Sequence, residues 1–151
     1  MPVVHMSGSW FKRDSAASLM AELREKGHEI AVDWTSEAYQ EMDHYPDQFT
    51  LTFNTGIEKC DVLLLSFEGM QERTHSATFY LYAVAVATGK RVVVYDPDAA
   101  TRSERFRGEP VHPAFHDLLG WSFLRCPNVA WVRTRDELFT AIEVFCPWVT
   151  E

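Results

Sequence analysis

The 151-residue sequence predicts a single α/β domain with a doubly wound, parallel sheet of five strands. Strand-like segments alternate with helical segments from one end of the chain to the other, the order typical of parallel α/β sheets. Two of the strand-like segments, Asp61–Ser66 and Arg91–Tyr95, are almost continuously apolar. Strands buried on both faces of a parallel sheet have this composition. The length suits one domain with a sizeable core.

Short apolar runs that stop at polar or turn-forming residues identify the strands. We expect them at Pro2–Met6, His28–Trp34, Asp61–Ser66, Arg91–Tyr95 and Asn128–Val132. In the second of these, Ile30, Val32 and Trp34 alternate with more polar residues. Doubly wound sheets of five strands commonly have the order 2-1-3-4-5, which we therefore expect here.

Helical spacing of apolar residues, together with end signals, places the helices between the strands. We expect them at Ser15–Lys26, about Gln48–Lys59, Ser76–Thr88, Ala114–Leu119 and Thr134 to about Phe145. Asp14 is expected to cap the first helix, and Gly27 to end it. Thr134 and Glu137 have the spacing of a capping box. Long irregular segments are expected at Thr35–Asp47, Phe67–His75 and Asp96–Pro113.

Charge and hydropathy exclude several classes of partner. A net charge of −8 argues against binding to duplex nucleic acid, which normally requires a basic face. No apolar run approaches the roughly 20 residues of a membrane-spanning helix, so we expect no membrane association. The first residues lack the basic flank and long apolar stretch of a signal peptide. These features predict a cytoplasmic protein.

The cysteines predict neither disulfides nor a metal site. There are three, Cys60, Cys126 and Cys146, and none is paired in a CxxC spacing. An odd number without such spacing argues against a disulfide framework and against zinc. We interpret them as small buried residues and expect no metal and no cofactor.

A ligand site is expected at the carboxyl ends of the strands, where ligands bind to open parallel sheets. The candidate binding residues share a position at a strand end or at the start of a helix: Ser7, Gly8, Ser9, Trp10, Arg13, Asp33 and Ser76. Ser7–Ser9 is rich in hydrogen-bond donors and leads into a helix, whose N-terminus favours an anion. A plain strand-to-helix turn would have the same composition, and Ser76 would equally serve as a helix cap. Trp10 could stack on a base, whereas Trp34 is expected to be a packing residue.

Four segments of the chain resemble the nucleoside 2-deoxyribosyltransferase-like family, which includes nucleotide N-glycosidases. They are Met6–Ser9, Gly27–Ile30, Ile57–Val62 and Ala83–Val92. Their order and spacing carry the resemblance, which runs from Val3 to about Pro97. It implies a flavodoxin-like fold, a nucleoside or nucleotide ligand and a homodimer. It also implies cleavage or exchange of the N-glycosidic bond by a glutamate nucleophile near the start of the fourth helix, assisted by an aspartate in the preceding helix.

The sequence departs from the family at both of these carboxylates. The nucleophile position falls on Leu81, or on Tyr80 if the count slips by one residue, and no Asp or Glu lies between Arg73 and Lys90. The assisting position falls on Phe53, with Asn54 beside it. Tyr80 and Glu68 are the candidate catalytic residues that remain. Glu68 follows the third strand and is a candidate general acid or base.

Three functions are compatible with this pattern. The chain binds a nucleoside, a nucleotide or a nucleotide-derived small molecule, with weak or absent glycosidic chemistry. Alternatively, it is an active transferase or N-glycosidase that uses a relocated carboxylate from Glu68, Glu72 or a partner subunit. In the third interpretation the fold serves as a protein-interaction module. The missing carboxylates favour binding over catalysis.

Overall fold

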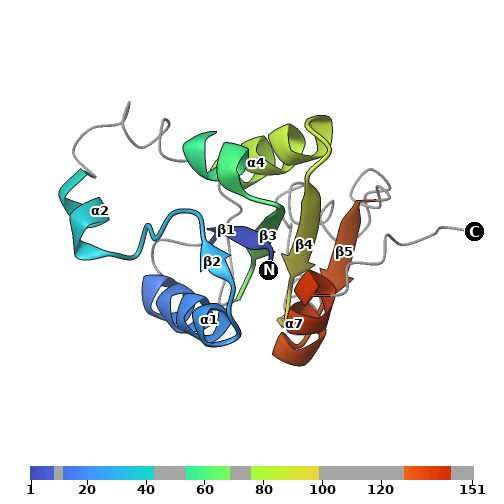
Figure 1. The fold of residues 1–151 in the computed structure, drawn as a ribbon, viewed down its shortest axis with the longest axis horizontal. Helices are drawn as coiled ribbons and strands as arrows, with labels where there is room; N and C mark the ends of the chain where they lie inside the picture. Colours follow the sequence, from blue (N-terminus) through green and yellow to red (C-terminus); the bar gives the residue numbers. More distant parts are fainter. Residues whose placement is uncertain (9–11, 43–53, 69–75, 99–127, 144–151) are drawn as a thin grey trace, which may run out of the picture.

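The computed structural model describes residues 1–8, 12–42, 54–68, 76–98 and 128–143 (Figure 1). Its centre is a five-stranded, wholly parallel sheet of order β2-β1-β3-β4-β5. The strands are β1 (Val3–Ser7), β2 (Glu29–Ile30), β3 (Val62–Ser66), β4 (Arg91–Tyr95) and β5 (Val129–Val132). The predicted flavodoxin-like fold and strand order are confirmed. The predicted helix at Ala114–Leu119 lies outside the described residues.

Helices cover both faces of the sheet, which gives three layers (Figure 1). The described helices are α1 (Arg13–Glu25), α2 (Glu37–Met42), residues 54–59, α4 (Ser76–Ala87) and α7 (Arg135–Glu143). One apolar core lies between the sheet and α1 with α7, and the other lies between the sheet and α4 with residues 54–59. None of the helices described combines the length and the apolar character needed to cross a membrane.

The central strands β3 and β4 are almost wholly apolar because both of their faces are covered. In β3 all five residues are buried, and Leu63 and Leu65 enter one core while Val62 and Leu64 enter the other. This alternation is the period-two geometry of a strand applied to two cores. It explains why β3 and β4 appear in the sequence as continuous apolar runs.

Two helices end in the same way, on a glycine with positive φ. Gly27 has φ of 90° and Gly89 has φ of 73°. After α1, the N–H of His28 donates to Leu23 and that of Gly27 donates to Arg24; Lys90 and Gly89 repeat this pattern after α4. These are Schellman motifs, in which glycine adopts the left-handed conformation without steric cost. The predicted stop at Gly27 is confirmed.

Two predictions for the segment after the first helix are wrong. The second strand is only Glu29–Ile30 instead of His28–Trp34, and α2 lies within the predicted loop Thr35–Asp47. Beyond Ile30, the Asp33 carboxylate accepts from the N–H of Thr35, and the Ser36 hydroxyl accepts from the N–H of Tyr39 at the start of α2. Such bonds compete with strand pairing.

The prediction that Asp14 caps the first helix is wrong. The helix begins at Arg13, two residues before the predicted start, its N-cap is Lys12, and no side chain caps it. Asp14 lies in the first turn, where its negative charge favours the positive end of the helix dipole. The capping box at Thr134 and Glu137 is confirmed: Thr134 Oγ1 accepts from the Glu137 N–H (3.1 Å), and the Glu137 carboxylate accepts from the Arg133 N–H (2.9 Å).

A histidine lies inside the core beneath residues 54–59. The His5 side chain is fully buried, and burial lowers its pKa to about 4. A methyl group added at Gly56 would lie 2.7 Å from Nε2 of this ring and still closer to other ring atoms. Gly56 is therefore required by the imidazole beneath it, and the helix cannot lie this close to the sheet with any larger residue there.

Candidate functional site

The chain order reverses between β1 and β3, which lie side by side in the sheet. Ser7 pairs with Leu65 in the register, so Gly8 and Ser66 follow next to each other at the carboxyl edge. Glu68 lies two residues further on. Ligands of open α/β sheets bind outside the carboxyl ends of the strands at such a reversal. The candidate site is therefore the carboxyl edge around the β1–β3 junction.

Trp34 packs against the end of β1. It is 4% exposed, and its indole Nε1 donates a hydrogen bond of 2.8 Å to the carbonyl of Met6. A Cβ at Gly8 would lie 3.4 Å from the Trp34 ring and 3.9 Å from the carbonyl oxygen of Ser66. The prediction that Trp34 is a packing residue is confirmed. Gly8 lets this ring lie against the backbone, where a methyl group would just fit and a branched side chain would not.

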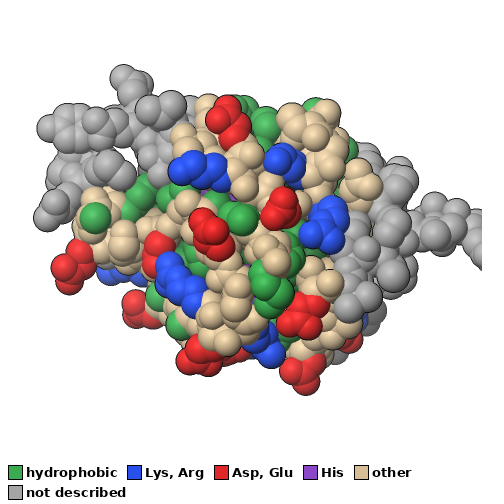
Figure 2. Space-filling model, in the orientation of Figure 1, with side chains coloured by type: hydrophobic (Ala, Val, Ile, Leu, Met, Phe, Trp, Pro, Cys, Tyr) green, Lys and Arg blue, Asp and Glu red, His purple; other side chains and the backbone are tan. Residues whose placement is uncertain are grey.

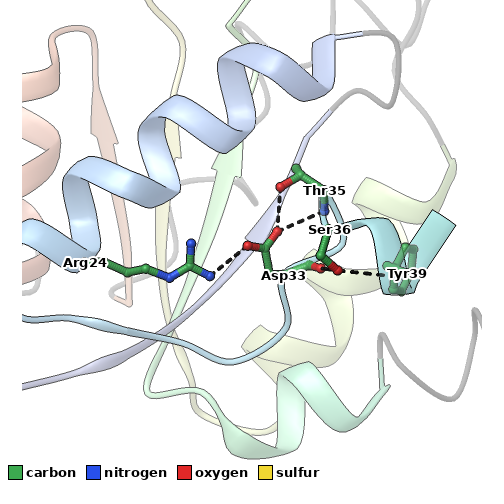
Figure 3. A network of polar contacts seen from close by, with 5 residues as sticks. All are labelled: Arg24, Asp33, Thr35, Ser36 and Tyr39. Atoms are coloured by element: carbon green, nitrogen blue, oxygen red, sulfur yellow. Dashed lines mark hydrogen bonds and ion pairs between the residues drawn. The ribbon is translucent and has the colours of Figure 1, made fainter.

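Asp33 forms the centre of a polar network beside the junction (Figure 3). Its carboxylate pairs with Arg24 (2.8 Å) and accepts from the N–H (3.0 Å) and hydroxyl (2.5 Å) of Thr35. The carbonyl of Asp33 accepts from Ser36, whose hydroxyl accepts from the N–H of Tyr39. Burial acts to raise the pKa of Asp33, but the bonds from Thr35 and Arg24 outweigh it, and the pKa lies below its ordinary value. The network starts α2 and holds Asp33 as an anion.

Glu68 takes part in a second polar cluster, between β3, β4, α1 and α7. Arg135 Nη2 lies 3.3 and 3.4 Å from the two oxygens of Glu68, and Nη1 forms an ion pair with Glu22. Burial raises the pKa of Tyr95, and the charges of Glu68 and Asp98 raise it further, while Arg135 opposes the rise. Burial acts to lower the pKa of Arg135, but Glu68 and Glu22 outweigh it and raise the pKa.

Tyr80 lies on the opposite side of the sheet from this cluster. It is 50% exposed on α4, and its hydroxyl donates a hydrogen bond of 3.1 Å to the side-chain oxygen of Asn54. The neighbouring Leu81 is 1% exposed and belongs to the core. A hydrogen bond thus joins Tyr80 to Asn54, two residues at or beside the positions where the sequence resemblance implies carboxylates. The two candidate catalytic residues therefore lie on opposite faces of the sheet: Glu68 pairs with Arg135 of α7, and Tyr80 lies on α4.

The other predicted site residues are placed as follows. Ser7 is the buried last residue of β1, and Arg13 is the exposed first residue of α1. Ser76 begins α4, and its side chain is not among those described. Ser9 and Trp10 lie outside the described residues.

Sequence reasoning missed Arg135, Glu22 and Tyr95. Tyr95 ends β4 and Arg135 begins the helix after β5, so both lie at the carboxyl edge that the fold prediction singles out. Applying that rule to the fourth and fifth strands would have found them. Glu22, in the middle of α1, gives no such signal.

Metal binding has no support in the part of the chain that is described: no three His, Cys, Asp or Glu side chains are grouped there to hold an ion. The face drawn in Figure 2 carries acidic and basic side chains interspersed with apolar ones. Charges of both signs are therefore mixed on this face.

Comparisons with protein-family models, with curated proteins and with solved structures gave no match for this chain. What can be said of the site therefore rests on its own geometry.

Proposed function

We propose that this protein binds a nucleoside- or nucleotide-like small molecule at the carboxyl edge of its sheet, and performs little or no chemistry on the N-glycosidic bond. The observation that carries the proposal is the reversal of strand order at β1 and β3, with Gly8 and Glu68 at the ends of these two strands. The resemblance of four sequence segments to the nucleoside 2-deoxyribosyltransferase-like family supplies the class of ligand.

Several features of this edge support binding. Trp34 closes one side of the junction, and the hydrogen bond to Met6 fixes its ring. Glu68 and Asp33 are both partly exposed, with 27% of each side chain accessible, and each is held by an arginine. Side chains fixed in this way lose little conformational freedom when a ligand arrives, which favours affinity.

The polar groups near the family's reacting positions argue against covalent catalysis. A retaining mechanism needs a carboxylate nucleophile and a second carboxyl group about 5 Å away. By the resemblance, the first position falls on Leu81, or on Tyr80 if the count slips by one residue, and the second falls on Phe53 with Asn54 beside it, so neither carries a carboxyl group. An ordinary phenol, with a pKa of about 10, is almost entirely protonated at neutral pH and attacks poorly. Glu68 is a carboxylate, but it faces α1 and α7 and not α4.

A thermal-shift screen against nucleosides, their monophosphates and cyclic nucleotides tests the binding proposal. A ligand at one hundred times its dissociation constant stabilises the fold by about 2.7 kcal/mol, which raises the midpoint by several degrees. The same ligands are then incubated with the protein, and the free base is measured chromatographically. We expect a shift without base release. No shift with any of these compounds would exclude the proposed ligand class.

Robust base release would instead favour an active N-glycosidase. Three variants then locate the responsible group: Glu68→Gln, Tyr80→Phe and Asp33→Asn. Glu58→Gln is the matched control, because it makes the same change at an exposed site near the amino ends of the strands. Loss of release in one variant alone, with an unchanged unfolding midpoint, would name the residue that replaces the family's nucleophile.

A further inference from the structure

The charges around Tyr95 are unbalanced. Arg135 forms ion pairs with two carboxylates, Glu22 and Glu68. The charges of Glu68 and Asp98 also raise the pKa of Tyr95, and Arg135 opposes this rise. Among the described residues, the ion pairs around Arg135 therefore place two carboxylates against one guanidinium.

Arg135 contacts Glu22 and Glu68 through different nitrogens of its guanidinium. Its Nη1 makes a close ion pair with Glu22, whereas its Nη2 lies 3.3–3.4 Å from Glu68, beyond the usual 2.7–3.2 Å of an N–H···O bond. Glu22 pairs with the guanidinium from α1, and Glu68, which contacts Nη2, has 27% of its side chain accessible. Because a carboxylate has about four acceptor sites, Glu68 retains most of its capacity.

We propose that Arg135 is a positioning residue, which acts through Glu68, and that Glu68 accepts hydrogen bonds from an uncharged hydroxyl or N–H group of the ligand. The inference rests on the proposed function and specifies which groups of the ligand are recognised at the edge formed by β3 and β4. A nucleoside presents such donors on its sugar and base.

A phosphate group does not suit this half of the edge. It would approach the carboxylates of Glu68 and Glu22, and the guanidinium of Arg135, which pairs with both, already has two anionic partners. Like charges at short range repel in a partly desolvated site. We therefore expect that a ligand with a phosphate places it away from Glu68, and that the phosphate does not strengthen binding here.

The test measures dissociation constants by calorimetry for adenosine, guanosine, cytidine and thymidine, for their 5′-monophosphates, and for inorganic phosphate. We expect at least one nucleoside to bind as tightly as its monophosphate, and inorganic phosphate not to compete with it. Glu68→Gln should weaken nucleoside binding by about 10-fold or more, because a hydrogen bond to a charged acceptor is lost. Arg135→Gln should weaken it too, and Arg135→Lys, which keeps the charge, should restore part of the loss.

Matched controls make the same chemical changes at the opposite edge of the sheet. Arg91→Gln, at the start of β4, corresponds to Arg135→Gln, and Glu58→Gln corresponds to Glu68→Gln. Both controls should bind the nucleoside as the parent does. A monophosphate that binds tighter than its nucleoside, and loses this advantage in Arg135→Gln, would overturn the inference, because Arg135 would then contact the phosphate itself.

The titration of Tyr95, followed by NMR of ring-labelled tyrosine, tests the positioning role without a ligand. Removing the charge of Glu68 should lower the pKa of Tyr95, and removing the charge of Arg135 should raise it, since the two charges act on the phenol in opposite directions. If the pKa of Tyr95 moves by the same amount in the same direction in both variants, or in neither, the proposed placement of Glu68 and Arg135 around Tyr95 is wrong. If these shifts occur but no nucleoside or monophosphate binds the parent, the proposed function fails, and the specificity inference fails with it.

Discussion

The buried imidazole of His5 should make the stability of the fold depend on pH between about 7 and 4. The ring is uncharged in the folded protein, because burial lowers its pKa to about 4, while in the unfolded chain a histidine has a pKa of about 6.5. Between these two values the unfolded chain binds a proton that the folded protein does not. Stability is therefore complete above pH 6.5 and falls as the pH is lowered towards 4.

The shift from 6.5 to about 4 corresponds to about 3 kcal/mol, since each pKa unit is worth about 1.4 kcal/mol. At pH 4.5 most of this has been lost. Such a loss is large beside the 5–15 kcal/mol that separates typical domains from their unfolded state. Protonation would place a charge directly below Gly56, where the packing leaves no room for the ring to move away.

Urea unfolding at pH 7.5 and at pH 4.5, for the parent and for His5→Leu, measures this contribution. The parent should lose about 2–3 kcal/mol more than the variant between the two pH values. The variant is less stable at pH 7.5 if leucine packs poorly, but this does not affect the comparison, which uses the change with pH. An identical pH dependence in both proteins would refute the reasoning and mean that His5 is protonated in the folded state.

Three further changes test the packing and the caps. Gly56→Ala should destabilise the fold by about 1–3 kcal/mol or more in urea unfolding, because the new methyl group overlaps the His5 ring and overpacks the core. A neutral result would show that helix 54–59 lies further from β1. Leu81→Ala should lower the free energy of unfolding by about 2–5 kcal/mol, and Tyr80→Phe, at the neighbouring position, by less than about 1 kcal/mol, since of the two only Leu81 is buried. Equal losses would mean that α4 is rotated about its axis. Thr134→Ala should cost about 1 kcal/mol through loss of the cap on α7, and Thr134→Ser should not; the two are compared by thermal unfolding.

The central strands and the end of the first helix could be predicted because their signals are local, whereas the strand order was expected only from what is common among doubly wound sheets. Continuous apolar runs identify β3 and β4, and Gly27 marks a helix end through its backbone alone. The early end of β2 could not be predicted from hydrophobic alternation, because Ile30, Val32 and Trp34 fit a strand equally well. The bonds that the Asp33 carboxylate accepts from Thr35 and Arg24 favour a turn at this point instead.

The candidate site was only partly predictable, for a related reason. The position of an edge residue follows from the strand order, so Gly8 and Glu68 could be placed at the carboxyl edge. Their partners could not, because Arg135 lies 67 residues from Glu68 in the chain and pairing at that distance leaves no periodic signal. The contact between Tyr80 and Asn54, 26 residues apart, depends in the same way on how two helices lie on the sheet.

The most direct test of ligand binding at the β1–β3 junction is an NMR titration of the ¹⁵N-labelled protein with nucleosides. We expect the amide signals of Ser7, Gly8 and Glu68 to shift in a saturable way, while those of Asp61 and Arg91, at the amino ends of β3 and β4, stay unchanged. The anomeric proton of the nucleoside in the same sample should remain that of the intact compound over hours. Shifts confined to the amino edge, or none at all, would contradict the proposed site, and conversion of the nucleoside to free base would contradict binding without catalysis.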